Sequence, residues 1–226
     1  MKYFTLLIAV VSVSLPVISQ KCGLSVKHGF IMKMLCAFTY LLTGALAALT
    51  FGEITAYAVL VLGALAAGFL GDFFLEYKAK KLFPLGTAFF ALGHLVYSYT
   101  FLSVNAQNIM SDIIAVSVIT LILSAVIVIF AKTKLKLHGK KNLLLVYAPV
   151  LIFAFASALV RGVGAVMADK PAFGICLIVG GILFFASDVM IGLGKGGFER
   201  PAFLRNAVSY TYFAAQALFA LSICFQ

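Results

Sequence analysis

The chain alternates between long apolar runs and short polar connections. A membrane-spanning helix needs about 17–25 mostly apolar residues in succession, and eight runs meet this requirement. The predicted spans cover residues 3–19, 31–51, 54–76, 83–103, 110–131, 143–160, 172–193 and 204–225. The first run is the weakest, because it is short and is interrupted by Pro16. The pattern predicts an all-α, polytopic membrane helical bundle of eight transmembrane helices.

Composition agrees with this pattern. Of the 226 residues, 64% are hydrophobic and 11% are charged, whereas soluble domains average about 45–50% and about 25%. No polar stretch is long enough for a soluble domain, so residues 1–226 are expected to form a single transmembrane domain. The four cysteines are scattered, and we expect buried thiols rather than a disulfide framework or a zinc site.

The basic residues predict the orientation of the bundle. Of the 17 Lys and Arg residues, 14 lie on one side if successive spans alternate in direction, and 3 lie on the other. The larger group consists of Lys21, Lys27, Lys33, Lys78, Lys80, Lys81, Lys132, Lys134, Lys136, Lys140, Lys141, Lys195, Arg200 and Arg205. Because Lys and Arg concentrate in cytoplasmic loops, both termini are expected on the extracytoplasmic side. The net charge of +10 is interpreted as loop charge that faces anionic lipid, not as a nucleic-acid-binding surface.

The first 20 residues also resemble a secretory signal peptide, with Val17 and Ser19 at suitable positions before a cleavage site. Cleavage there would reverse every later span and export the Lys-rich loops. The charge bias therefore favours a retained first helix. The second span carries Lys33 near its start, where a long side chain can extend along the helix to the membrane interface.

Two aspartates interrupt the apolar runs. Asp72 lies in the third span and Asp188 in the seventh, each about two turns from the predicted cytoplasmic end. A carboxylate at membrane depth costs about 2.5–3.5 kcal/mol on insertion scales. Two of them at similar depth in separate helices indicate a shared polar chamber. Glu76, four residues after Asp72, is interpreted as an interfacial carboxylate beside Lys78 and Lys80.

Other polar residues fall at a similar depth. His94 lies near the middle of the fourth span with Tyr97 one turn later, and Tyr212 and Gln216 share a face of the eighth span. An interhelical hydrogen bond and a functional role explain His94 equally well. Because His94 is the only histidine within the predicted spans, a zinc site with two or three histidine ligands cannot form there. We predict no metal and no other cofactor.

Four segments carry a resemblance to a known family. They are GDFFLEY (71–77), ALGHLVYSY (91–99), GGILFFASDVMIG (180–192) and YFAAQALFAL (212–221). In this order and at these spans, they resemble the lysoplasmalogenase or YhhN-like family of membrane proteins. The resemblance implies eight spans and hydrolysis of the vinyl ether bond of a lysophospholipid. The site residues that it implies are Asp72, His94, Tyr97, Ser187, Asp188, Tyr212 and Gln216.

The chemistry of that reaction suits two carboxyl groups. Vinyl ether hydrolysis begins with a proton transfer to carbon and passes through an oxocarbenium ion that water captures. One protonated carboxyl can supply the proton, and one carboxylate can stabilise the cation or activate the water. Two nearby carboxyl groups in a low dielectric favour that division, because both cannot ionise cheaply. Asp72 and Asp188 are therefore the expected catalytic residues, and the sequence does not distinguish which is the acid.

Three other functions are compatible with two intramembrane carboxyl groups. A proton-coupled transporter of a small molecule or a lipid is the strongest of them, because such groups often relay protons. An intramembrane aspartyl protease would carry GxGD, and Phe69 breaks that motif. A lipid-binding or structural protein is the third. The short loops favour the inner membrane of a bacterium, and the lipid bilayer and a lysophospholipid are the expected partners.

Overall fold

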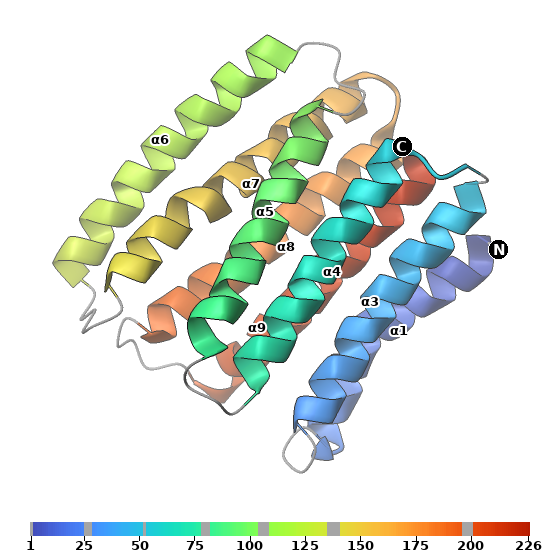
Figure 1. Cartoon of the computed structure of the whole chain (residues 1–226), viewed down its shortest axis with the longest axis horizontal. Coiled ribbons are helices and arrows are strands. Elements are labelled where there is room, and N and C mark those ends of the chain that lie inside the picture. The colour runs from blue at the N-terminus through green and yellow to red at the C-terminus, as the bar shows by residue number, and fades with distance from the viewer. Residues whose placement is uncertain are drawn as a thin grey trace.

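The computed structural model describes residues 2–24, 29–51, 53–77, 82–103, 109–134, 141–195 and 201–226. These residues form an all-α bundle (Figure 1). Its helices are α1 (Lys2–Lys21), α3 (Gly29–Phe51), α4 (Ala56–Glu76), α5 (Phe83–Ser103), α6 (Ile109–Lys134), α7 (Lys141–Met167), α8 (Pro171–Lys195), α9 (Ala202–Ser222) and the 3₁₀ turn η2 (Ile223–Phe225). The eight α-helices are each long and apolar enough to span a membrane. The protein is thus an integral membrane protein, and the prediction of eight spans is confirmed.

Both termini lie at the same end of the bundle (Figure 1). The helices α1, α4, α6 and α8 finish at the opposite end, which we call the Lys-rich end because Lys21, Lys33 and Lys132 lie there. Successive helices thus run in opposite directions, as an even number of spans with both termini on one side requires. Placement of the Lys-rich end in the cytoplasm stays a prediction from the charge bias.

Pro16 does not interrupt the first helix, so that prediction is wrong. The helix α1 continues through Pro16 to Lys21. A proline at this position lacks the N–H that would donate to the Ser12 carbonyl, a loss that membrane helices tolerate. The helix packs against α3 and α9. Its retention in the mature protein stays a prediction.

The predicted end of the sixth span, at residue 160, was also wrong. The helix α7 continues to Met167, so that Arg161 lies inside the helix and not in a loop. The charge of Arg161 has a partner within the bundle, because its guanidinium carbon lies 5.8 Å from the ring centroid of Phe173 on α8. A cation over an aromatic face is stabilised electrostatically, which allows the apolar helix to extend past the arginine.

Glycines hold α8 tightly between α7 and α9. A Cβ placed on Gly180 would lie 2.8 Å from a ring carbon of Phe219 on α9, and one on Gly181 would lie 3.0 Å from the Cβ of Ala158 on α7. Lipid tails are as apolar as leucine, so helices in a membrane associate through close packing at small residues. These two glycines therefore set the spacing of the three helices, in agreement with the close packing expected for such residues.

The centre of the bundle is aromatic. Tyr97, Phe184, Tyr212 and Phe219 are buried there, and the ring centroids of Tyr97 and Phe219 are 4.7 Å apart. In contrast, α6 lies at the edge of the bundle, packs chiefly on α7 and is the least buried of the eight helices (Figure 1). The polar site lies between the aromatic centre and the Lys-rich end.

Candidate functional site

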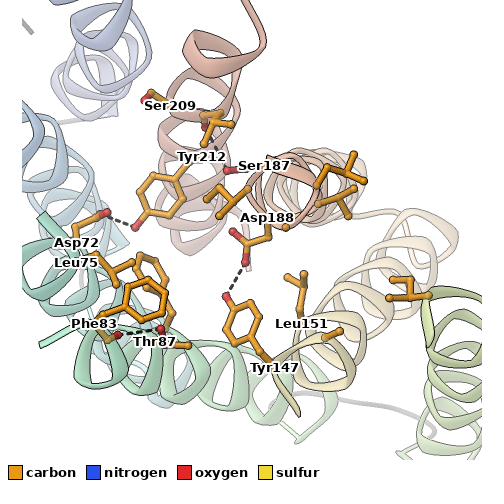
Figure 2. Close-up of a pocket in the computed structure, with 18 of the residues that line it drawn as sticks. Asp72, Leu75, Phe83, Thr87, Tyr147, Leu151, Ser187, Asp188, Ser209 and Tyr212 are labelled. Carbon is orange, nitrogen blue, oxygen red and sulfur yellow. Dashed lines mark hydrogen bonds between the residues drawn. The ribbon is translucent and has the colours of Figure 1, made fainter. Parts of the chain in front are cut away.

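A cavity of about 280 Å³ opens within the half of the bundle nearer the Lys-rich end. Every long helix except α1 contributes to its wall, and both Asp72 and Asp188 line it. Figure 2 shows the two carboxyl groups on opposite sides of this space, each with the hydroxyl of a tyrosine pointing at it. None of the hydrogen bonds described for these side chains joins the two aspartates to each other. The shared chamber that the sequence suggests is therefore present as a space with two separate carboxyl groups in its wall.

Asp72 contacts two kinds of group, a neutral phenol and a charged ammonium. The Tyr212 hydroxyl donates to Asp72 Oδ2 at 2.7 Å, and Lys33 Nζ lies 3.2 Å from Oδ1. The same ammonium also lies 3.3 Å from Glu76 Oε2. The Asp72 side chain is only 3% exposed, so the ion pair with Lys33 is the main compensation for burying its charge.

Behind Asp72, a chain of hydrogen bonds leads back into the aromatic centre. Gln216 Nε2 donates to the Tyr212 hydroxyl at 3.1 Å, and the Tyr97 hydroxyl donates to Gln216 Oε1 at 2.8 Å. Tyr97, Tyr212 and Gln216 are all buried. Each buried polar group of this chain thus has a partner, which fixes the direction in which the Tyr212 hydroxyl points.

Asp188 has different partners. The Tyr147 hydroxyl donates to Asp188 Oδ2 at 2.6 Å, and His94 Nε2 lies 3.5 Å from the same oxygen. His94 Nε2 is also within hydrogen-bond distance of the Tyr147 hydroxyl, at 2.8 Å. The three side chains form a compact group from α5, α7 and α8. Among the described side chains, no Lys or Arg forms an ion pair with Asp188.

Local sequence explains why these groups can approach. A Cβ on Gly68 would lie 2.7 Å from Gln216 Nε2 and 3.3 Å from the Tyr212 hydroxyl. The absence of a side chain at Gly68 therefore leaves the space in which α9 presents its polar face to α4. On α8, the Ser187 hydroxyl donates to the Val208 carbonyl of α9 at 3.2 Å. This bond ties α8 to α9 next to Asp188.

Comparison with known proteins agrees with the motifs that converge here. A model of the YhhN family matches residues 30–223. The chain belongs to the YhhN family. This family includes lysoplasmalogenases, and the matched range contains all four segments that carry the resemblance. No curated protein and no solved structure matches the chain.

The structure brings the predicted residues of this YhhN protein together in two ways. Asp72, Ser187, Asp188 and Tyr212 line the cavity itself. The other four predicted residues stand behind that wall. They are Glu76, His94, Tyr97 and Gln216. Three of them contact residues that form the wall, and Tyr97 contacts one of these three, Gln216.

Two residues of the YhhN site were interpreted wrongly or missed. Lys33 was expected to extend to the interface, but it lines the cavity and forms an ion pair with Asp72. Two carboxylates on one face of α4 attract it more strongly than the interface does. Tyr147 was not predicted at all. Its signal was weak but present, because it is a tyrosine inside an apolar run on the Lys-rich side of Pro149.

Glu76 is 40% exposed at its side chain and forms an ion pair with Lys33. This exposure agrees with the interfacial carboxylate that was expected. The neighbours expected for it, Lys78 and Lys80, lie outside the described residues. Within the described part of the chain, no group of three or more His, Cys, Asp and Glu residues could hold a metal ion. The titratable side chains that the structure places at the site are carboxyl, phenol, imidazole and ammonium groups.

Proposed function

We propose that this protein hydrolyses the vinyl ether bond of a lysoplasmalogen, a phospholipid with a single hydrocarbon chain. The products are a fatty aldehyde and a glycerophospho-ethanolamine or -choline. One observation carries the proposal: Asp72 and Asp188, from separate helices, stand in the wall of one cavity at membrane depth. Membership of a family that includes lysoplasmalogenases supports it.

In the proposed first step, Asp188 is the acid. Its carboxyl proton adds to the vinyl carbon that is remote from the ether oxygen, and the double-bond electrons form the new C–H bond. An oxocarbenium ion remains, shared between the other vinyl carbon and the oxygen. Asp188 suits this role because, among the described side chains, it lacks a Lys or Arg partner that would favour its charged form. Tyr147 and His94 hold the carboxyl group in place.

In the second step, Asp72 acts as the carboxylate. Its ion pair with Lys33 at 3.2 Å favours the charged state, and a negative charge in a water-poor cavity stabilises the oxocarbenium ion. Water attacks the cationic carbon and yields a proton to the Asp188 carboxylate. The resulting hemiacetal collapses to the aldehyde and the free glycerol hydroxyl. One water molecule is consumed, and the proton lost by Asp188 is restored.

The remaining residues are proposed to position these two groups. Tyr212, Gln216 and Tyr97 fix the direction of the hydrogen bond to Asp72. Glu76 shares the Lys33 ammonium, and Ser187 anchors the helix turn that carries Asp188. The headgroup would then lie toward the Lys-rich end.

The test is aldehyde release from lysoplasmalogen by the purified protein. We expect Asp188→Asn to lower the rate by about 10²–10⁴-fold, the usual contribution of a general acid, and Asp72→Asn to abolish activity as well. Asp112→Asn is the matched control, because Asp112 lies in the first turn of α6 and does not line the cavity. We expect that variant to keep wild-type activity.

Full activity in either Asp72→Asn or Asp188→Asn would contradict the proposed mechanism. An ester-linked lysophospholipid run in parallel shows whether the vinyl ether is required. If no aldehyde appears, proton-coupled uptake of a lipid or small molecule into vesicles would instead support a transporter that uses the same two carboxyl groups.

A further inference from the structure

The cavity has a polar part and an apolar part. The polar part contains Lys33 and the two aspartates with their tyrosines. The apolar part, which we call the α6 arm, is lined by Ile127, Phe130 and Ala131 of α6 and by Ala148 and Leu151 of α7. No side chain of the α6 arm carries a hydrogen-bonding group or a charge. A hydrocarbon fits such a wall, whereas a polar ligand would lose its hydrogen bonds there.

The α6 arm reaches the lipid-facing surface of the protein. Phe130 lines the cavity and is also 41% exposed, so that this residue belongs to the inner wall and to the outer surface at once. Its neighbour Ala131 is buried at 4% exposure. Because α6 packs chiefly on α7 at the edge of the bundle, lipid lies directly beyond it. The cavity therefore meets the bilayer at Phe130.

We propose that the α6 arm is the binding site for the hydrocarbon chain of a single-chain lipid, and that this lipid reaches the aspartates sideways from the bilayer past Phe130. The polar end of the lipid then faces Lys33 and the Lys-rich end, and the chain lies along Ile127 and Phe130. A cavity of about 280 Å³ is slightly smaller than the usual range for ligand pockets, roughly 300–1,000 Å³. That size favours one hydrocarbon chain over two.

The inference rests on the proposed function for the bond that is cut, but the binding of the chain can be tested without catalysis. The sequence contains no tryptophan, so a single introduced tryptophan is the only indole fluorophore. Phe130→Trp places the indole at the cavity. Ile129→Trp places it one residue earlier, at a position where the native side chain is 63% exposed and does not line the cavity. Both variants are reconstituted in vesicles of unlabelled two-chain phosphatidylcholine.

A single-chain phosphatidylcholine with a brominated chain is then titrated into the vesicles as a quencher. We expect saturable quenching of the Phe130→Trp fluorescence, reversed by an unlabelled single-chain lipid and not by an added two-chain lipid. Ile129→Trp should show only quenching that rises in proportion to the bromolipid in the bilayer. Identical, unsaturable quenching at both positions would overturn the proposal, whether or not the protein releases aldehyde.

A second comparison measures the consequence for turnover. Ile127→Trp fills the α6 arm, whereas Ile129→Trp adds the same side chain to the outer face of the same helix. We expect Ile127→Trp to lower kcat/KM for a long-chain lysoplasmalogen by about tenfold or more, as an overfilled apolar site does, and to spare a short-chain analogue. Equal loss for the long and the short substrate would overturn the assignment of the chain to this arm. Absence of activity in the wild-type protein would count against the proposed function alone, since the quenching experiment still decides the binding site.

Discussion

The two aspartates share a cavity but have unlike surroundings. Asp72 is bound on one side by an ammonium and on the other by a phenol that is itself the end of a buried hydrogen-bond chain. Asp188 meets a phenol and an imidazole, and its side chain is 10% exposed. Two identical residues in two candidate membrane spans thus have different neighbours. In the proposed mechanism, these partners make one carboxyl group the acid and keep the other as the carboxylate.

The largest effect is expected from Lys33→Met, which removes the cation shared by Asp72 and Glu76 and leaves the described partners of Asp188 unchanged. Breaking a buried ion pair costs about 3–5 kcal/mol when the remaining charge is buried, and we expect less here because the Lys33 side chain is 29% exposed. Thermal unfolding should shift downward, and activity should be lost. Lys132→Met, on an exposed lysine of α6, is the control and should change neither.

The double variant Lys33→Met with Asp72→Asn sharpens this result. Neutralising both partners removes the unpaired charge, so we expect the melting temperature to recover while activity does not. If Lys33→Met retains activity and stability, the ion pair has no part in distinguishing Asp72 from Asp188.

The next largest effect is expected when either tyrosine loses its hydroxyl. Tyr212 donates to the Asp72 carboxylate, and Tyr147 donates to the carboxylate that forms on Asp188 as it gives up its proton. A hydrogen bond to a charged group contributes about 1.5–3 kcal/mol, which corresponds to roughly 10–150-fold in rate. Tyr147→Phe and Tyr212→Phe should each lower kcat within that range. Tyr99→Phe is the control, because Tyr99 is 62% exposed on α5.

Double-mutant cycles then test whether the two groups are separate. Tyr147→Phe should be non-additive with Asp188→Asn and additive with Asp72→Asn, since only contacting residues couple. Tyr212→Phe should show the opposite pairing. Equal coupling of one tyrosine to both aspartates would mean that the cavity works as one network.

A smaller effect is expected at Gly68, which supports the Asp72 side alone. Gly68→Ala would put a Cβ 2.7 Å from Gln216 Nε2, so that the Gln216 amide and the Tyr212 hydroxyl must shift. We expect reduced kcat with a folded protein. Gly63→Ala lies on the same helix with nothing within 4 Å of the new Cβ and should leave activity unchanged. A normal Gly68→Ala enzyme would show that the direction of the Tyr212 hydroxyl is unimportant.

The smallest effect is expected from Tyr97→Phe, which removes the far end of the chain to Asp72. Hydrogen bonds between membrane helices average about 0.6 kcal/mol, so the activity should fall only a few-fold and the melting temperature slightly. The hydroxyl of Tyr97 is separated from Asp72 by Gln216 and Tyr212. A loss as large as that of Tyr212→Phe would extend the functional network into the aromatic centre.

Much of this site was visible in the sequence because polar residues are conspicuous in apolar runs. Asp72, Asp188 and His94 stood out for that reason, and the spacing of Tyr212 and Gln216 placed both on one helical face. Lys33 was misjudged and Tyr147 was missed for a related reason. Near a helix end, a lysine or a tyrosine is normally interfacial, and sequence position alone does not show that the side chain turns inward.

The eight spans, the family and the two costly aspartates could all be predicted from the order of residues along the chain. The reason is that the free energy of transferring a residue into hydrocarbon depends mainly on its own side chain. The tertiary structure alone decided which helix faces meet. The rotation of each helix depends on contacts with several others, such as the space at Gly68 and the packing of Gly180 and Gly181. Those contacts gave Asp72 an ammonium, gave Asp188 an imidazole, and opened the α6 arm between them and the lipid.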